Sequence, residues 1–99
     1  MKRWSSDEKF QFFEQLRLQI ERRELDVAGI VKKLRVEFLG VDQEEFARLG
    51  KVSVRTLKAI EAGQGNPTLK TLNGLLRPFG LEMGVVPRVV VPPPRPPPE

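Results

Sequence analysis

The stretch DQEEFARLGKVSVRTLKAIEAG, residues 42–63, decides the fold. Asp42 and Ser53 each precede a run of helix-forming residues, and their side-chain oxygens can accept a hydrogen bond from an unpaired backbone N–H at a helix start. Residues 50–52 (GKV) interrupt the pattern, and Gly63 follows the last periodic residue, where a helix commonly ends in a left-handed turn. We therefore expect two short helices joined by a tight elbow.

The apolar residues of this stretch fit the same two helices. Phe46, Ala47 and Leu49 give the first helix a hydrophobic side, and Leu57 and Ile60, three positions apart, share a face of the second. Each helix then has one side to bury and one side to expose. Two capped helices with a glycine-bearing elbow between them constitute a helix-turn-helix.

The charges along this unit are typical of a surface that meets nucleic acid. Residues 47–59 contain no acid, whereas Arg48, Lys51, Arg55 and Lys58 are all basic. The whole chain of 99 residues, enough for one small domain, carries 17 Lys and Arg against 13 Asp and Glu, a net charge of +4. This mild basic excess is compatible with a nucleic-acid partner.

The second helix predicts specific contacts with double-stranded operator DNA. A helix fits the major groove, where Arg55 is expected to hold a guanine with its two-pronged donor group and Val54 to meet a thymine methyl. Gln43, at the start of the first helix, suits a phosphate oxygen. Hydroxyls and a further charge complete the predicted DNA-binding set, which is Gln43, Ser53, Val54, Arg55, Thr56 and Lys58. The alternative is a plain helical hairpin whose basic residues are only solvated.

Other classes of function lack the residues they need. The chain has no cysteine and no histidine, which excludes disulfides, the usual Cys/His zinc sites and the Ser–His or Cys–His catalytic pairs. Asp42, Glu44 and Glu45 cluster, but the dipole of the helix they begin explains them without a metal. We expect no enzyme, no cofactor and no metal. No apolar run approaches the ~20 residues of a membrane span, so we expect no membrane partner and a cytoplasmic location, at the nucleoid when DNA is bound.

Residues 1–25 are expected to form an arm and a helix. The arm, 1–6, is typical of a frayed start, although Lys2 and Arg3 would also suit a phosphate. The helix is expected from Ser6 or Asp7 to about Glu24. It either packs on the domain or forms a dimer, because its helically spaced apolar residues are Phe10, Phe13, Leu16 and Ile20, with Phe12 off that line.

Residues 26–81 are expected to form the DNA-binding domain. Asp26 is a candidate cap for a helix that closes at Gly40. Its basic residues Lys32, Lys33 and Arg35 are interpreted as a solvated face, with a phosphate-binding patch as the alternative. After Gly63, turn residues lead to a last helix, for which Asn66 is the expected cap and Pro67 the first residue. The apolar faces of these two helices are predicted to be Ile30, Val31, Leu34 and Phe38, and Leu69, Leu72, Leu75 and Leu76.

The C-terminal residues change in character. Residues 82–91 are valine-rich and favour a strand, interrupted by Pro87. A lone strand in a helical domain leaves an unpaired edge, which pairing with the same strand of a second copy would satisfy. The alternatives are loose packing or cover by another protein. Residues 92–99, PPPRPPPE, are expected to be a disordered tail, either a groove ligand or simply a terminus.

The sequence over about 30–81 resembles the Cro/C1-type (XRE) helix-turn-helix family. The resemblance is carried by QEEFA at 43–47, VSVRTL at 52–57, IEAG at 60–63 and NPTLKTL at 66–72. It implies an all-α, lambda-repressor-like domain of about five helices that binds operators as a homodimer. It places Gln43 and Thr56 at phosphates and gives Glu61 a structural role, tying the recognition helix to the turn that follows.

Two features depart from the minimal family pattern. Lys51 stands where the family often has glycine, so it is expected at positive φ, and the helix within residues 1–25 is additional. The GNPTL turn at 65–69, the FGLEM run at 79–83 and the C-terminal strand resemble HipB-like antitoxins, which repress their own operon and bind a HipA-like kinase toxin. The alternative is a stand-alone regulator of this family without a toxin partner.

Overall fold

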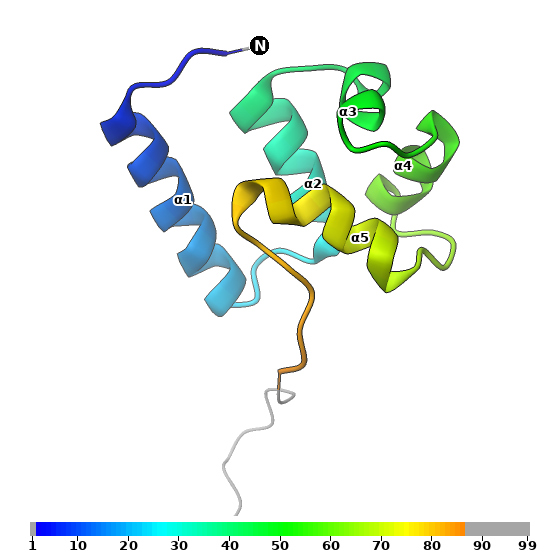
Figure 1. Ribbon diagram of the computed structural model, residues 1–99. Coiled ribbons are helices and arrows are strands. Elements are labelled where there is room, and N and C mark those ends of the chain that lie inside the picture. Colours follow the sequence, from blue (N-terminus) through cyan, green and yellow to red (C-terminus); the bar gives the residue numbers. More distant parts are fainter. Residues whose placement is uncertain (1, 87–99) are drawn as a thin grey trace, which may run out of the picture.

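The structure is a computed structural model that describes residues 2–86, and these residues are helical with short connections (Figure 1). In chain order the elements are α1 (Ser6–Glu21), α2 (Val27–Lys33), the π-helix η1 (Leu34–Leu39), α3 (Gln43–Leu49), α4 (Val54–Glu61), α5 (Leu69–Leu76) and the 3-10 turn η2 (Arg77–Phe79). The predicted all-α class and helix-turn-helix are confirmed.

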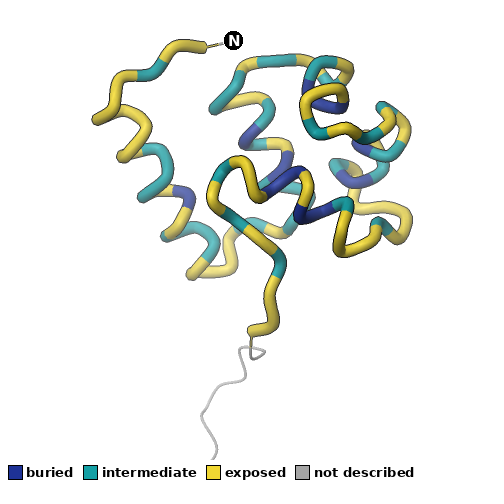
Figure 2. Tube along the Cα trace, in the orientation of Figure 1, coloured by how far each residue is buried: buried dark blue, intermediate teal, exposed yellow. Residues whose placement is uncertain are grey.

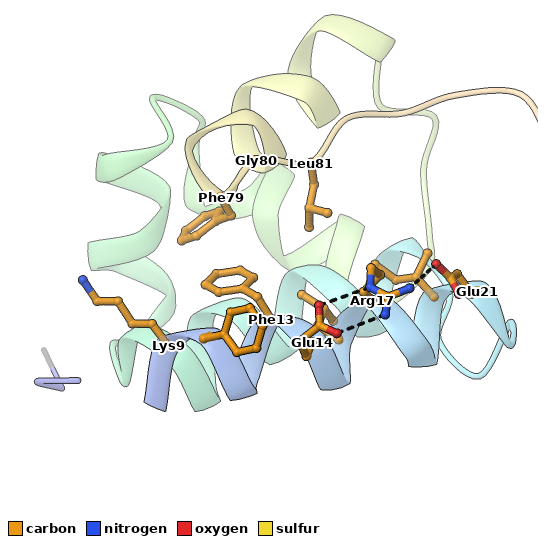
Figure 3. A pocket seen from close by; sticks show the side chains of 11 residues that line it. Lys9, Phe13, Glu14, Arg17, Glu21, Phe79, Gly80 and Leu81 are labelled. Atoms are coloured by element: carbon orange, nitrogen blue, oxygen red, sulfur yellow. Dashed lines mark hydrogen bonds and ion pairs between the residues drawn. The ribbon is translucent and has the colours of Figure 1, made fainter. Parts of the chain in front are cut away.

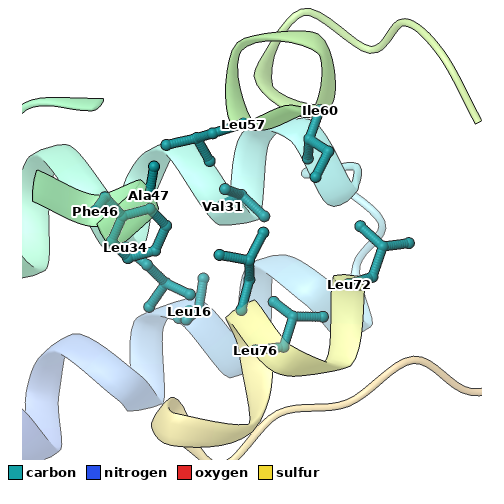
Figure 4. Packing of buried hydrophobic residues seen from close by; sticks show 10 residues of the cluster. Leu16, Val31, Leu34, Phe46, Ala47, Leu57, Ile60, Leu72 and Leu76 are labelled. Carbon is teal, nitrogen blue, oxygen red and sulfur yellow. The ribbon is translucent and has the colours of Figure 1, made fainter. Parts of the chain in front are cut away.

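A single hydrophobic core holds the helices together (Figures 2 and 4). Leu34 and Leu57 are fully enclosed, and Leu16 brings α1 into the same core. In Figure 1, α1 lies on one side of α2 and the α3–α4 pair lies on the other. The buried apolar residues are Leu16, Val31, Leu34, Phe46, Ala47, Leu57, Ile60, Leu72, Leu75 and Leu76.

Short polar side chains begin the helices as the sequence predicts. Asp26, Asp42 and Ser53 each accept a hydrogen bond from the backbone N–H three residues on. Ser5 does the same for Glu8 at 3.1 Å, and the Glu8 carboxylate accepts from the Ser5 N–H at 2.8 Å, which completes a capping box. These caps fix where α1, α2, α3 and α4 start.

The predicted start of the last helix is wrong by two residues. Thr68, not Asn66, is the cap, and its hydroxyl accepts from the Thr71 N–H at 3.1 Å. Pro67 therefore precedes the helix instead of beginning it. The shift also turns Leu69 outward, with 61% of its surface exposed, so the buried face of α5 consists of Leu72, Leu75 and Leu76.

The N-terminal arm is docked, contrary to the expectation of a frayed start. The Trp4 Nε1–H donates to the Phe38 carbonyl at 2.6 Å, and the Lys2 N–H donates to the Leu39 carbonyl at 3.0 Å. The Trp4 ring stacks on Phe38 and lies 5.5 Å from Phe12. The arm thus closes the C-terminal end of η1, where helix carbonyls lack partners within the helix.

The aromatic residues of α1 also differ from prediction, and α1 ends at Glu21 instead of Glu24. Phe12, placed off the apolar line, packs against Phe13 and Phe38, whereas Phe10 is 68% exposed. The docked Trp4 supplies the reason, because it draws the helix face that carries Phe12 toward η1.

The predicted C-terminal strand is absent from its described part. Residues 81–86 form no strand, and Val85 is completely exposed. The Met83 N–H donates to the buried Asn73 side chain at 2.7 Å, which holds the first part of this segment against α5. Residues 87–91, and the tail 92–99, lie outside the described residues.

Two residues of the elbow between α3 and α4 have special requirements. Lys51 must adopt a positive φ, and position 50 must lack a side chain. Lys51 has φ 58°, the positive value expected where glycine is more usual. Gly50 has φ −87°, which any residue adopts, but a Cβ there would lie 2.4 Å from Leu75 Cδ2. The glycine is therefore required by close packing against α5.

We predict opposite effects for two glycine-to-alanine changes. Gly50→Ala should lower the free energy of unfolding by about 1–3 kcal/mol, because the buried Leu75 has no room to move. Gly74→Ala should raise it by about 0.5–1 kcal/mol, because Gly74 is helical and a Cβ there would meet nothing within 4 Å. Urea unfolding measures both, and equal effects would contradict the packing argument.

Candidate nucleic-acid interface

The helices α3 and α4 pack through residues that lie on facing sides. Phe46 and Ala47 of α3, and Leu57 and Ile60 of α4, are all buried in the core (Figure 4). Each short helix therefore turns its opposite side to solvent. This side is where the sequence places the DNA contacts.

Arg55 and Lys58 are the exposed cations of α4. Among residues 2–86, neither forms a hydrogen bond or an ion pair, so both are available to a ligand. Arg48 of α3 is exposed as well but already pairs with Glu45. The free positive charge of the helix-turn-helix thus lies on α4 and, beside it, on Lys51 of the elbow.

Ser53 and Thr56 lie together at the start of α4. The Ser53 hydroxyl accepts from the Thr56 N–H at 3.0 Å and donates to the Thr56 hydroxyl at 2.8 Å. The Ser53 hydroxyl proton is thereby used in the cap, whereas the Thr56 hydroxyl keeps its own proton to donate. Of these two predicted contacts, Thr56 is the better placed to bind an acceptor such as a phosphate oxygen.

Val54 is less outward than the sequence analysis predicts. It is half-buried and packs against the hydrophobic core. With about 100° per residue in a helix, Val54 lies about 90° from the middle of the face shared by Leu57 and Ile60, whereas Arg55 lies about 170° from it. Val54 is therefore at the edge of the exposed face and Arg55 at its centre.

A partly buried ion pair ties α4 to an earlier helix. Arg35 of η1 donates to both oxygens of the Glu61 carboxylate, from Nε at 2.7 Å and from Nη2 at 2.9 Å. Its Nη1 donates to the Val41 carbonyl at 3.0 Å. The side chains of Arg35 and Glu61 are only 12% and 5% exposed, and the hydrogen bond to Glu61 raises the pKa of Arg35, which keeps the guanidinium charged.

Gln43 belongs to the same network. Its Nε2 donates to Glu61 Oε1 at 3.1 Å, which fixes the orientation of the amide. The second N–H of Nε2 is left to donate elsewhere, at the start of α3. The predicted phosphate contact is therefore compatible with the network, and Glu61 positions Gln43 as well as α4.

Sequence reasoning missed part of this site. The prediction that Arg35 lies on a solvated face is wrong, because its guanidinium binds Glu61. The Glu61 carboxylate contacts Arg35 and Gln43 instead of the turn after α4. One feature of the sequence is consistent with the buried-side position of Glu61, although it does not identify Arg35 as its partner. Glu61 is the one acid of α4 and lies one turn beyond Leu57, on the edge of the buried face.

The described residues hold no group of three or more histidine, cysteine or carboxylate side chains arranged for a metal ion. In the same part of the chain, no helix combines the length and apolar character that a bilayer crossing requires.

Two capped helices at a tight elbow, the second of which exposes unpaired cations, define a helix-turn-helix of the DNA-binding kind. A family model described as helix-turn-helix matches residues 31–86. The chain belongs to this helix-turn-helix family, of the Cro/C1 type that the sequence resembles.

One relative is a protein of Haemophilus influenzae named as an uncharacterized HTH-type transcriptional regulator. It is 41% identical to this chain over 49 residues, which make up 50% of this chain and 50% of the relative. The chain thus spans about half the length of the curated relative it matches. No solved structure matches the chain.

We predict that Glu61→Ala lowers the free energy of unfolding by about 2–3 kcal/mol, because it leaves the partly buried Arg35 guanidinium without its partner. The control Glu44→Ala removes an exposed acid from the first turn of α3 and should cost less than about 1 kcal/mol. Chemical denaturation measures both changes.

The double variant Arg35→Met, Glu61→Leu should recover most of the lost stability, because removal of both charges leaves none unpaired. A double variant no more stable than Glu61→Ala would contradict the explanation that the loss of stability comes from an unpaired charge.

Proposed function

We propose that this protein is a DNA-binding transcriptional repressor whose helix α4 enters the major groove of its operator. The observation that carries the proposal is the arrangement of charged residues on α4. Glu61 is bound by Arg35 on the inner side, while Arg55 and Lys58 are exposed and, among the described residues, unpaired. Arg55 is the guanine-reading residue of this proposal, since its guanidinium suits the two acceptors of a guanine edge.

Backbone contacts would set the orientation of α4 in the groove. The spare N–H of Gln43 and the free hydroxyl proton of Thr56 both suit phosphate oxygens. Lys58 adds charge, while Ser53 supports the helix start. Val54 contributes from the edge of the exposed face, where its methyl groups remain partly accessible to a thymine methyl.

We infer that the repressor acts as a homodimer joined through residues 82–91. A dimer would bind two half-sites of a two-fold symmetric operator. The exposed valines 85 and 86 support this inference, because apolar side chains on a segment that leaves the domain gain from a partner.

The more specific proposal is an antitoxin that represses its own operon and binds a HipA-like kinase toxin. It rests on the sequence resemblance at residues 65–69 and 79–83. A kinase-like reading frame beside the gene, whose product co-purifies with this chain, would support it. If there is no such neighbour, the stand-alone regulator is the better description.

Selection of bound fragments from random duplex DNA tests the repressor proposal, since it yields the binding sequence and reveals any two-fold symmetry. On the selected site, Arg55→Ala should weaken specific binding by about 1–3 kcal/mol with the fold intact, because one bidentate base contact is lost. Fluorescence anisotropy measures the affinity at fixed salt concentration.

The matched control is Arg22→Ala, which removes the same charge at the end of α1, away from α4. It should reduce affinity much less, and equally on specific and unrelated DNA. If folded Arg55→Ala bound the selected site as tightly as the wild type, Arg55 would not be a base contact. If no sequence were enriched, the repressor proposal would fail.

We predict that deletion of residues 84–99 produces a monomer or a weaker dimer, because the valines that would join two copies are removed. Sedimentation equilibrium measures the change. Circular dichroism should show unchanged helix content, since α1 to α5 end before the deletion. A truncated chain that forms an equally tight dimer would reject the C-terminal interface.

A further inference from the structure

An apolar groove lies between α1 and the turn that follows α5 (Figure 3). Its volume is about 640 Å³ and it opens to solvent. Figure 3 shows Phe79 and Leu81 on one wall, facing Phe13 across the groove. The apolar lining residues are Phe10, Phe13, Leu16, Ile20, Phe79 and Leu81. None of the described residues that line the groove belongs to α3 or α4.

Two features of the groove suit a surface that receives another chain. Phe10 is 68% exposed and lines the groove together with five other apolar residues, so its ring extends a contiguous apolar surface. At the rim, Arg17 pairs with Glu14 at 3.0 Å and with Glu21 at 2.6 Å. Two carboxylates share one guanidinium, so this end of the groove carries one net negative charge, while the fourth charged lining residue, Lys9, lies toward the other end (Figure 3).

The chain itself contains a segment that fits this surface. Leu81 lines the groove, Met83 is still held against α5, and residues 84–86 then lead away from the helices (Figure 1). The sequence beyond them reads PRVVVPPPRPPPE, in which Arg88 precedes the valine run 89–91. This run is the only stretch of valines in that sequence. The positive charge of Arg88 is opposite to the net negative charge of the rim formed by Glu14, Arg17 and Glu21.

We propose that residues 88–91 of a second copy of this chain occupy the groove. The inference rests on the homodimer of the proposed function and names the surface that the C-terminal segment contacts. Because residues 84–86 leave the helices, the groove of a second copy is the proposed site for the run that follows them. Reciprocal exchange gives two identical contacts related by a two-fold axis, which closes the dimer. Valines bury apolar surface in the groove while Arg88 meets the acidic rim.

The test uses full-length chains and sedimentation equilibrium. Phe10→Ser removes an exposed ring from the groove, and the triple change of valines 89, 90 and 91 to serine removes the run. Each should raise the dimer dissociation constant at least tenfold. Leu69→Ser is the matched control, because Leu69 is a comparably exposed apolar residue on α5, outside the groove, and it should have no effect.

Mixing the two weakened variants separates exchange from other arrangements. A mixed dimer keeps one intact groove on the triple-serine chain and one intact valine run on the Phe10→Ser chain. The mixture should therefore dimerise more tightly than either variant alone, and this rescue would support the proposal. A segment that folds back onto its own groove predicts no such rescue.

Other outcomes overturn the proposal in distinguishable ways. If the triple-serine chain weakens the dimer but Phe10→Ser does not, the segments pair with each other and the groove is not their site. If neither variant matters, the dimer uses another surface. In both cases, specific binding to the selected DNA would leave the repressor proposal standing. A wild-type chain that stays monomeric would overturn the homodimer and this inference together.

Discussion

The ion pair between Arg35 and Glu61 is the constraint on which the DNA-binding surface depends. Two charges removed from water are tolerated only when they satisfy each other, and here both guanidinium–carboxylate hydrogen bonds are short. A bidentate pair has one favourable geometry. It therefore fixes the rotation of α4 about its own axis as well as its distance from η1. The Gln43 amide, bound to the same carboxylate, adds α3 to the fixed unit.

This fixed rotation explains why the residues of α4 have different roles. Leu57 and Ile60 face the core, and Glu61 lies at one edge of that face beside Arg35. In a helix of 3.6 residues per turn, Arg55 then lies nearly opposite the core. A helix of only eight residues has no length to correct a wrong rotation. The buried ion pair is thus what directs the exposed guanidinium outward.

The sequence predicts those parts of the fold that depend on neighbours along the chain. The caps at Asp26, Asp42 and Ser53 follow from contacts three residues away, and the positive φ of Lys51 follows from the elbow. Contacts between distant residues could not be predicted in this way. Arg35 and Glu61 are 26 residues apart, and Trp4 and Phe38 are 34 apart. The start of α5 was harder to predict than the other helix starts, because Asn66 and Thr68 are both suitable caps. The sequence near the helix does not decide between them, and Thr68 is the cap in the structure.

The additional helix α1 has a consequence for how two copies can meet. Leu16 attaches α1 to the core, and the contacts of Trp4 with Phe12 and Phe38 attach it to η1. Helix α1 therefore forms one fixed side of the groove. The opposite wall, Phe79 to Leu81, is where the chain leaves the last helical turn. Because this surface and the outer face of α4 lie on different sides of the fold, a second copy could bind the one without covering the other.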